Sequence, residues 1–484
     1  MEKLVIYWSR RDFRLRDNPA LFFASQEAGD EGVVAVFFIE PYMTEGNPDC
    51  NFGYPSRYFL AKALPEFASN FKNFYIVCDK PVKTFKELKK KYMLSIYVNE
   101  DIHPDFYAQV RKLTDQEIEV HVLSDQLTVS KNLRSNSGKP YSVFTPFKNS
   151  AWNDFINASE APTTSLVTRR VPELDFGAIQ PNFETIWQRF CKNRVFKVGE
   201  HIIDLEEIFE EPPQSSEWYF TESQAVKRCR DFIEKKIECY NIARDFLGSA
   251  GNSFLSLGLT WGLISARTIK NFVLDFLGKK HLDVNSTSNR GSVSFISELI
   301  WREFYKYLYF HHPWIHNLEF QESKRNIKWK NGDSALEIFK TWIQGKTGYS
   351  IVDAAMREIA NSAFMHNRSR MIVASVLTKN FGVDWRWGQE YFRSALIDLD
   401  EASNNGGWQW AASVGADPKP IRIFNPYLQA QRFDPDFSYR KKWLGEDLEL
   451  YQDVVGKERG KILPLVEHAE ARLEALRRYG LVEF

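Results

Sequence analysis

Three side chains that could bind a flat polar ligand recur at helical spacing in the second half of the chain. Glu298, Trp301 and Arg302 stand at positions i, i+3 and i+4, so a helix over 295–304 places them on one face. A solvated charged face is the ordinary outcome of such spacing. In a cleft, the same indole would stack on a nucleobase while the charged groups hydrogen-bond its edge. Base binding is therefore one hypothesis for this helix.

A second segment with polar groups in helical order is MHNRSRM at 365–371. Asn367 and Met371 stand at i and i+4; Asn367 alone would be read as an N-cap, and Met371 alone as a core residue. Arg368 and Arg370 follow the expected helix start, where the helix dipole disfavours cations. We therefore expect the two arginines to pair with phosphate or carboxylate groups.

The string LIDLDEASNNGGWQW at 396–410 is the most specific in the chain. Asp398 and Asp400 would suit a metal, but no third ligand has the spacing of a calcium loop, so we predict none. The Asn and Gly pairs at 404–407 predict a loop with positive φ, where the backbone can approach a flat ligand closely.

The small-residue segment GNSFLS at 251–256 offers backbone N–H groups and hydroxyls suited to a diphosphate. It is not a Walker A loop, because no Gly-Lys-Ser/Thr follows it.

Composition narrows the class of protein. The 484 residues carry 63 basic and 63 acidic side chains, so the chain does not coat nucleic acid indiscriminately, although a local basic groove remains compatible with this balance. No apolar run of about 18 residues and no leader pattern occur, which predicts neither a membrane span nor a signal peptide. The five cysteines form no Cys-x-x-Cys pair, which favours a reducing cytoplasm over a disulfide framework. The 14 tryptophans are unusual, and packing explains most of them.

The elements that must position these residues change in kind along the chain. Short apolar runs at 4–8, 32–39, 74–78, 94–98 and 118–123 alternate with helical patterns, which predicts an α/β domain with a doubly wound, Rossmann-like parallel sheet. From about 220 onward helical periodicity dominates, at 224–238, 265–277, 293–310, 334–345, 352–361 and 367–380. We predict an α/β domain over 1–130, a linker over 131–200 and a mostly α-helical domain over 201–484.

Several long motifs in order give the chain a family resemblance. They are WSRRDFRLRDNPAL at 8–21, KPYSVFTPF at 139–147, GKTGY at 345–349, VDAAMR at 352–357 and RIFNP at 422–426, together with the segments above. The chain resembles the photolyase/cryptochrome family over nearly its whole length, and within it the class I cyclobutane pyrimidine dimer photolyases. The resemblance implies a light-driven repair enzyme, a lyase, that binds FAD in the helical domain.

The resemblance also assigns FAD-binding positions. Those at the diphosphate are Tyr240, Asn252, Ser253, Phe254, Leu255 and Ser256, and those around the ring system are Arg370, Asp398, Leu399, Asp400 and Asn404. Arg370 matches the partner of Asp398, and Asn404 matches the residue that faces flavin N5. An amide there supports an anionic reduced flavin without adding a negative charge. The sequence departs from the family at Asn252, Phe254 and Leu257, where Thr, a basic residue and Pro are usual, so a cation near the diphosphate is lost.

Substrate and electron-transfer residues are carried over in the same way. The family flips a pyrimidine dimer out of DNA, as photolyases do in general, and excited reduced FAD lends the dimer an electron that splits its cyclobutane ring. The matching DNA and dimer positions are Arg244, Glu298, Trp301, Asn367, Arg368, Met371 and Trp410. Trp408, Trp385 and Trp329 match the tryptophan chain that photoreduces the flavin. A local basic face is expected from Lys324, Arg325, Lys328, Arg368, Arg432, Arg440, Lys441 and Lys442.

Glu100 matches the position at which folate-type members hold an antenna, methenyltetrahydrofolate, although a deazaflavin or a second flavin stays open. DNA containing pyrimidine dimers is the expected partner, with no membrane, no obligate protein partner and a monomeric state.

Three alternatives were weighed against dimer repair. A cryptochrome-type blue-light receptor is disfavoured because 466–472 resemble the start of the family's last conserved helix and only 473–484 follow, so we expect no signalling tail. Met371 also disfavours the DASH-type cryptochromes, whose motif resembles this one but has Gln at that position. A (6-4) photolyase would need more histidines near 365–371, where only His366 occurs. A non-catalytic nucleotide-binding protein would leave the helical half unexplained.

Overall fold

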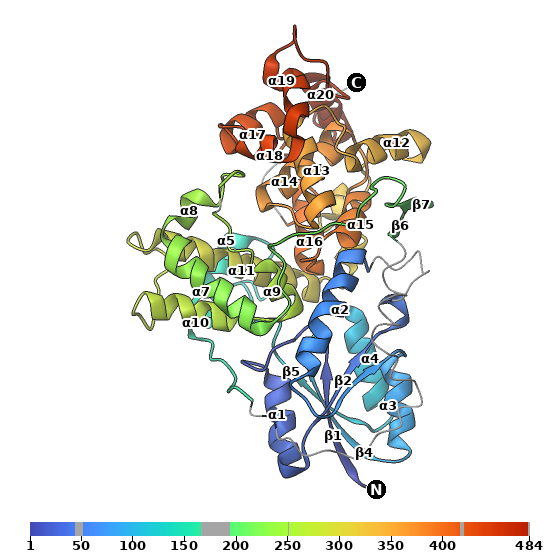
Figure 1. Cartoon of the computed structure of the whole chain (residues 1–484), viewed down its shortest axis with the longest axis vertical. Coiled ribbons are helices and arrows are strands. Elements are labelled where there is room, and N and C mark those ends of the chain that lie inside the picture. The colour runs from blue at the N-terminus through green and yellow to red at the C-terminus, as the bar shows by residue number, and fades with distance from the viewer. Residues whose placement is uncertain (44–51, 165, 167–193, 250, 417–420, 483–484) are drawn as a thin grey trace. The chain divides into compact units, whose positions relative to one another are not determined.

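The structure, a computed structural model, describes residues 1–43, 52–164, 166, 194–249, 251–416 and 421–482, and it forms two compact units (Figure 1). Unit 1 contains Met1–Asn193, Glu217–Glu238 and Ser253–Pro313, and unit 2 contains Arg194–Ser216, Cys239–Asn252 and Trp314–Phe484. The predicted domain limits at 130 and 200 stay predictions, and part of the predicted linker, 165 and 167–193, lies outside the described residues.

Unit 1 is built around a five-stranded parallel sheet in the order β3-β2-β1-β4-β5. Its strands are β1 (Lys3–Ser9), β2 (Val34–Phe38), β3 (Phe74–Val77), β4 (Met93–Asn99) and β5 (Glu119–Leu123). Ile6 of the central strand pairs with Val34 on one side and Ile96 on the other. All five strands lie where the apolar runs predicted them, and the expected fold class is confirmed.

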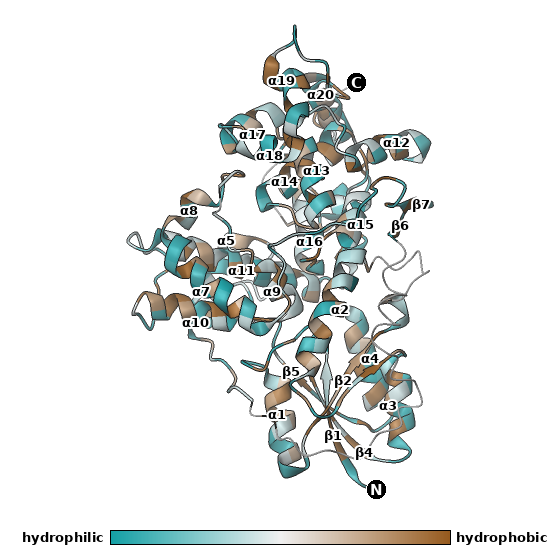
Figure 2. Cartoon of the chain, in the orientation of Figure 1, coloured by the Kyte–Doolittle hydropathy of each residue, from teal (hydrophilic) through white to brown (hydrophobic). Residues whose placement is uncertain are grey.

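Successive side chains of β1 point to opposite faces of the sheet. Leu4, Ile6 and Trp8 belong to one buried cluster with side chains of α3 (Pro81–Lys89) and α4 (Pro104–Thr114). Tyr7 points the other way, where its hydroxyl accepts a hydrogen bond from Asn18, the N-cap of α1 (Pro19–Ala28). Figure 2 shows the strands largely in brown, as expected for a sheet covered on both faces.

The remaining helices of unit 1 are α2 (Tyr54–Ala68), α5 (Phe144–Asn157), α7 (Glu222–Lys236), α9 (Ser256–Trp261), α10 (Ala266–Phe276) and α11 (Arg290–His311). α7 begins at a capping box in which Thr221 and Gln224 satisfy each other's backbone N–H groups. α5 was not predicted and lies inside the expected linker. It forms because Phe147, Ala151, Trp152 and Phe155 bury one face.

Unit 2 is mostly helical. Its elements are the hairpin β6 (Val195–Val198) and β7 (His201–Asp204), followed by α8 (Tyr240–Ala243), α12 (Gly332–Ile343), α13 (Ser350–Ser362), α14 (Asn367–Ser375), a π-helix η6 (Val376–Asn380), α15 (Trp385–Ala395), α16 (Glu401–Ala411), α17 (Pro426–Phe433), α18 (Ser438–Leu444), α19 (Gln452–Val455) and α20 (His468–Arg478). A single apolar core joins α12 to α18 through Trp342, Tyr391 and Trp408.

Within the described ranges, no helix is long and apolar enough to cross a membrane. In that same part of the chain, no group of three His, Cys, Asp or Glu side chains is arranged to hold a metal ion. Among the described residues, Cys78, Cys229 and Cys239 form no disulfide.

Candidate functional site

Arg370 and Asp398 form the buried ion pair that the family resemblance predicted. Nη2 of Arg370 donates to both carboxylate oxygens of Asp398, at 2.9 and 2.8 Å, and Nε donates to the carbonyl oxygen of Met365 at 2.8 Å. Asp398 is 3% exposed, so its charge depends on this partner. The pair fixes the segment before α16 against the first turn of α14 and gives Arg370 the carboxylate partner expected of it.

The expected loop at 404–407 is wrong, because these residues belong to helix α16. Asp400 caps the helix by accepting the N–H of Ser403 at 2.9 Å, and neither Gly406 nor Gly407 has a positive φ. Side chains of the helix hold it in place: Gln409 donates to the carbonyl oxygen of Ile315 at 2.8 Å and of Leu318 at 3.2 Å. These tertiary hydrogen bonds outweigh the poor helix propensity of Asn and Gly.

Asn404 nevertheless keeps a place suited to a flat ligand. Its amide donates to the carbonyl oxygen of Gln389 at 3.1 Å, which sets the direction of its side chain. A Cβ added at Gly407 would meet no atom within 4 Å, so α16 carries open space there rather than packed neighbours. A planar ligand that approached α16 at Gly407 would therefore meet no side chain there.

Three predicted substrate residues lie together at the start of α14. The amide of Asn367 and Nη1 of Arg368 each contact the sulfur of Met371 at 3.9 Å. Arg368 also pairs with Asp245 and lies over the ring of Phe433 at 4.2 Å. The N-cap is His366, whose Nδ1 accepts the N–H of Arg368 at 3.0 Å, so the alternative role of Asn367 as a cap is wrong. Asn367 is instead exposed on the first turn.

His366 caps α14 as a neutral ring. Burial, together with the charges of Arg368 and Arg370, lowers the pKa of His366 to about 4. Glu358 of α13 lies behind it and accepts the backbone N–H of His366 at 3.2 Å and the hydroxyl of Tyr439 at 2.5 Å. Burial raises the pKa of Glu358 to about 7, although these donors and the charges of Arg370 and Lys442 oppose the rise. No sequence pattern pointed to Glu358.

The raised pKa of Glu358 predicts a pH-dependent stability. A carboxyl group that titrates near 7 when folded and near its model value 4.5 when unfolded binds its proton more tightly in the folded chain. Stability from this group is therefore full below the unfolded pKa and falls as pH rises to about 7, by roughly 3 kcal/mol. We expect Glu358→Gln to remove this fall, measured as the free energy of urea unfolding near pH 5 and near pH 8.

Glu337→Gln, on the exposed side of α12, is the control and should keep the pH profile of the parent chain. An unchanged profile in Glu358→Gln would contradict the assignment.

In unit 1, Trp301 is part of an aromatic stack on α11. Its ring stacks on Phe144 of α5 with centroids 3.5 Å apart and lies 5.6 Å from Tyr305, so one indole face is already covered. Glu298 lies one turn earlier and is half-buried. Arg302 turns to the loop after β5, where it donates to the carbonyl oxygen of Gln126 at 3.3 Å. The base-binding hypothesis therefore keeps Glu298 and Trp301 but not Arg302.

The expected diphosphate segment belongs to unit 1 from Ser253 onward, while Asn252 belongs to unit 2. Phe254 has φ of 53°, a left-handed conformation, and its carbonyl oxygen accepts the hydroxyl of Tyr219 at 2.9 Å. Arg228 of α7 lies over the rings of Tyr219 and Phe254, at 5.1 and 5.8 Å. A guanidinium is thus present beside Phe254, although the segment itself lost its usual cation. In unit 2, Arg244 lies over the ring of Tyr240 at 5.8 Å.

The three tryptophans of the predicted electron path lie in unit 2. Trp385 and Trp408 are 0% and 2% exposed, and Trp329 is half-buried with its ring 6.2 Å from that of Tyr479. Trp408 packs on Phe392 and Trp342, at 5.0 and 6.1 Å. Trp410, the predicted dimer contact, lies under the guanidinium of Arg422 at 5.1 Å. Arg440 does not belong to the expected basic face, because it is buried and paired with Asp434 at 2.8 Å.

Glu100 follows the carboxyl end of β4, where parallel sheets bind ligands. It is 3% exposed, pairs with Lys131 and accepts the hydroxyl of Tyr107 at 2.7 Å. Burial, reinforced by the Glu100 charge, raises the pKa of Tyr107. The predicted antenna carboxylate is therefore already bonded within the protein.

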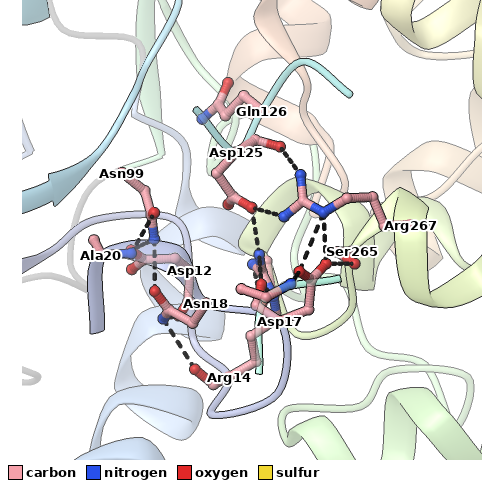
Figure 3. Close-up of polar contacts among 12 residues, drawn as sticks. Asp12, Arg14, Asp17, Asn18, Ala20, Asn99, Asp125, Gln126, Ser265 and Arg267 are labelled. Carbon is pink, nitrogen blue, oxygen red and sulfur yellow. Dashed lines mark hydrogen bonds and ion pairs between the residues drawn. The ribbon is translucent and has the colours of Figure 1, made fainter. Parts of the chain in front are cut away.

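The opening motif at 8–21 forms a buried polar network in unit 1 (Figure 3). Asn99 of β4 donates to Asp12 and to Asn18 at 2.7 Å each. Asp17 accepts Nε of Arg267 at 2.8 Å and the hydroxyl of Ser265 at 2.5 Å. The motif thus ties the carboxyl edge of the sheet to α10.

Comparisons with known proteins agree with this geometry. Two family models match, "DNA photolyase" over 5–165 and "FAD binding domain of DNA photolyase" over 295–480. A deoxyribodipyrimidine photo-lyase of Neurospora crassa is 32% identical over 99% of this chain and 82% of its own. The class III photolyase of Agrobacterium tumefaciens has a TM-score of 0.80 at 30% identity, covering 99% and 98% of the two chains.

An archaeal photolyase from Sulfolobus tokodaii, described with two FAD molecules, has a TM-score of 0.75 at 26% identity over the full length of both chains. A Synechocystis cryptochrome, with a TM-score of 0.81 at 23% identity over 99% of each chain, shows the fold alone.

The fold and the site define a light-dependent flavoprotein with an α/β domain and a helical FAD-binding domain. The chain belongs to the DNA photolyase family. The finer prediction of class I stays a prediction, since the class III structure is among the similar ones.

Proposed function

We propose that the chain is a deoxyribodipyrimidine photolyase, which splits cyclobutane pyrimidine dimers in DNA with blue or near-UV light. The observation that supports this most directly is the buried Arg370–Asp398 pair, which anchors the start of α16 against α14, where Asn367, Arg368 and Met371 lie together. Within unit 2, the Arg370–Asp398 pair thus links the residues proposed to bind the flavin with those proposed to bind the substrate.

The residues present fit FAD. Asn404 would offer a neutral amide to the flavin, and Leu399 with the Arg370–Asp398 pair would help to hold its ring system. Gly407 leaves open space on the same helix. Bound in its reduced, anionic form, FAD supplies the electron that opens the cyclobutane ring and recovers it afterwards. The protein's part is to hold the dimer, exclude water and keep competing negative charge away from the flavin.

The dimer is held by an aromatic wall and a few polar groups. In unit 1, Trp301 would offer a ring face to a flipped base and Glu298 would accept hydrogen bonds from its edge. In unit 2, Trp410 would offer a ring face of its own. Arg244, Arg368 and the exposed basic residues Lys328, Arg432, Lys441 and Lys442 contact the DNA backbone. We further propose a monomer in a reducing cytoplasm that needs no protein partner.

We also propose that a second chromophore binds at the carboxyl edge of the sheet near Glu100, with methenyltetrahydrofolate preferred over a deazaflavin. Supporting this is the cluster of buried polar groups there, in which Arg10 pairs with Asp101 at 3.2 Å and Gln109 donates to Glu40 at 2.7 Å.

The function is tested with purified, photoreduced protein and an oligonucleotide carrying one cyclobutane thymine dimer. We expect light-dependent loss of the dimer, assayed by restored cleavage at a site the dimer blocks. Photoreduction of bound FAD without any loss of dimer would contradict repair and favour a blue-light receptor.

The substrate pocket makes its own prediction for Trp301→Ala. Losing one base-stacking ring should weaken binding of dimer-containing DNA by roughly 1–3 kcal/mol, while FAD content stays at the parent level. Affinity is measured by fluorescence anisotropy in the dark, and FAD by its absorbance. Trp314→Ala, at an exposed tryptophan without a predicted role, is the control. An equal loss of FAD in Trp301→Ala would assign Trp301 to packing instead.

A further inference from the structure

The indole N–H of Trp385 donates to a buried carboxylate. Trp385 starts α15 and is fully buried, and its Nε1 lies 3.2 Å from Oε1 of Glu319, which is 3% exposed. A buried tryptophan N–H usually finds some acceptor, most often a neutral one. Here the acceptor is a base able to take the proton.

Arg386 is the cation nearest to this hydrogen bond. Nη2 of Arg386 donates to the same Oε1 of Glu319 at 2.8 Å, and its guanidinium lies 4.8 Å from the centre of the Trp385 ring. The same arginine also pairs with Asp384 at 2.9 Å. Two carboxylates therefore share one guanidinium beside the indole.

Two further groups face Glu319. Nε of Arg325 donates to the backbone carbonyl oxygen of Glu319 at 3.3 Å rather than to its carboxylate. Burial raises the pKa of Tyr479, and the charge of Glu319 adds to the rise. The phenol of Tyr479 therefore stays neutral and adds no charge beside Glu319.

Trp408 has the opposite environment. Its Nε1 is buried and has no hydrogen-bond partner among the residues that the structure describes. Its ring lies directly against α15 at Gly388, where an added Cβ would fall 2.0 Å from Cη2 of the indole. Gly388 follows Trp385 by three residues, so both rings adjoin the same side of α15. The indole N–H of Trp385 thus has a hydrogen-bond acceptor, whereas that of Trp408 has none among the described residues.

We propose that Glu319 accepts the indole proton of Trp385 during light-driven electron transfer and thereby keeps the tryptophan radical at Trp385. This inference rests on the proposed role of the tryptophans. With FAD bound, Trp408 would give one electron to the light-excited oxidised flavin and would regain one from Trp385. The radical cation left on Trp385 then releases its Nε1 proton to Oε1 of Glu319, which yields a neutral indole radical and a neutral carboxylic acid.

The direction of transfer follows from the surroundings of the two rings. An indole radical cation is a far stronger acid than indole, so a carboxylate in hydrogen-bond contact takes its proton without rearrangement. Before the proton moves, the nearby negative charge stabilises the cation, and burial strengthens this attraction. For Trp408 to reduce the Trp385 radical again, the proton would first have to return from Glu319 to the indole nitrogen of Trp385.

The test uses two substitutions in a Trp329→Phe background. Without Trp329 the radical cannot move beyond Trp385. Glu319→Gln removes the base but keeps an acceptor oxygen, and Asp384→Asn removes the same charge without touching the indole N–H. Transient absorption after a flash distinguishes a neutral from a cationic tryptophan radical. We expect a neutral radical in the parent and in Asp384→Asn. In Glu319→Gln we expect a cation that recombines faster by a factor on the order of ten.

A measurement in the dark tests the hydrogen bond without photochemistry. With nitrogen-15-labelled tryptophan, the Nε1–H resonance of Trp385 is assigned by its absence from Trp385→Phe. We expect an upfield shift in Glu319→Gln but not in Asp384→Asn.

The possible failures are distinct. A neutral radical with parental lifetime in Glu319→Gln, or an unmoved resonance, overturns the role of Glu319. No tryptophan radical in the parent, with the resonance shift intact, overturns the electron path itself and the inference with it.

Discussion

Trp408→Phe should slow light-driven reduction of bound FAD by a factor on the order of 100, while enzyme reduced chemically beforehand still repairs dimers. Trp408 is the buried tryptophan on α16, the helix that also carries Asn404, and phenylalanine is much harder to oxidise than indole. The measurement is the bleaching rate of oxidised FAD under blue light with an external electron donor. Repair by dithionite-reduced protein isolates substrate chemistry from photoreduction.

Trp342→Phe is the matched control for this prediction. Trp342 is equally buried in the same core and lies 6.1 Å from Trp408, but it has no place in the predicted path. We expect it to photoreduce at close to the parental rate. A comparable loss in Trp342→Phe would place Trp342 on the electron path and contradict the path predicted here.

Local pattern predicted the sheet because a doubly covered strand must be apolar throughout. Val34–Phe38 is buried at every position, and its neighbours were found for the same reason. α5 was missed because the turn residues at 136–140 before it, and the polar segment with Pro162 and Pro172 after it, indicated a connection. Its helical register is fixed by partners such as Phe304, which lies 5.2 Å from Phe147 and more than 150 residues later in the chain.

The candidate site shows the same limit. Motifs supplied Asn404 and Trp410, but α16 was expected to be a loop, because its stability depends on hydrogen bonds to Ile315 and Leu318 that no local window contains. Glu319 and Glu358 were missed for a related reason. A lone glutamate in sequence has no signal until folding buries it against Trp385 or His366.

Arg267→Met should lower the free energy of unfolding of the chain by roughly 3–5 kcal/mol, because it leaves buried charges without their partner. Arg267 is 6% exposed and donates to Asp17 through Nε at 2.8 Å and to Asp125 through Nη2 at 2.7 Å. Arg14 shares Asp125 at 2.6 Å but gives Asp17 only contacts to its backbone. Asp17, 0% exposed, would therefore lose the ion pair at its carboxylate and keep hydrogen bonds such as that from Ser265 (Figure 3).

The pH dependence of this loss separates a charge effect from a packing effect. Burial alone would raise the pKa of Asp125, but Arg14 and Arg267 hold it below its ordinary value. Stability from Asp125 is thus present above the unfolded pKa of about 4 and lost as pH falls below it. The penalty of Arg267→Met in urea unfolding should be largest near pH 7 and shrink toward about pH 4, where protonation relieves the stranded carboxylates.

Lys235→Met, which breaks an exposed pair with Asp231 on α7, should change nothing measurable. A penalty of the same size at both pH values would mean that Arg267 acts through packing of its side chain rather than through its charge.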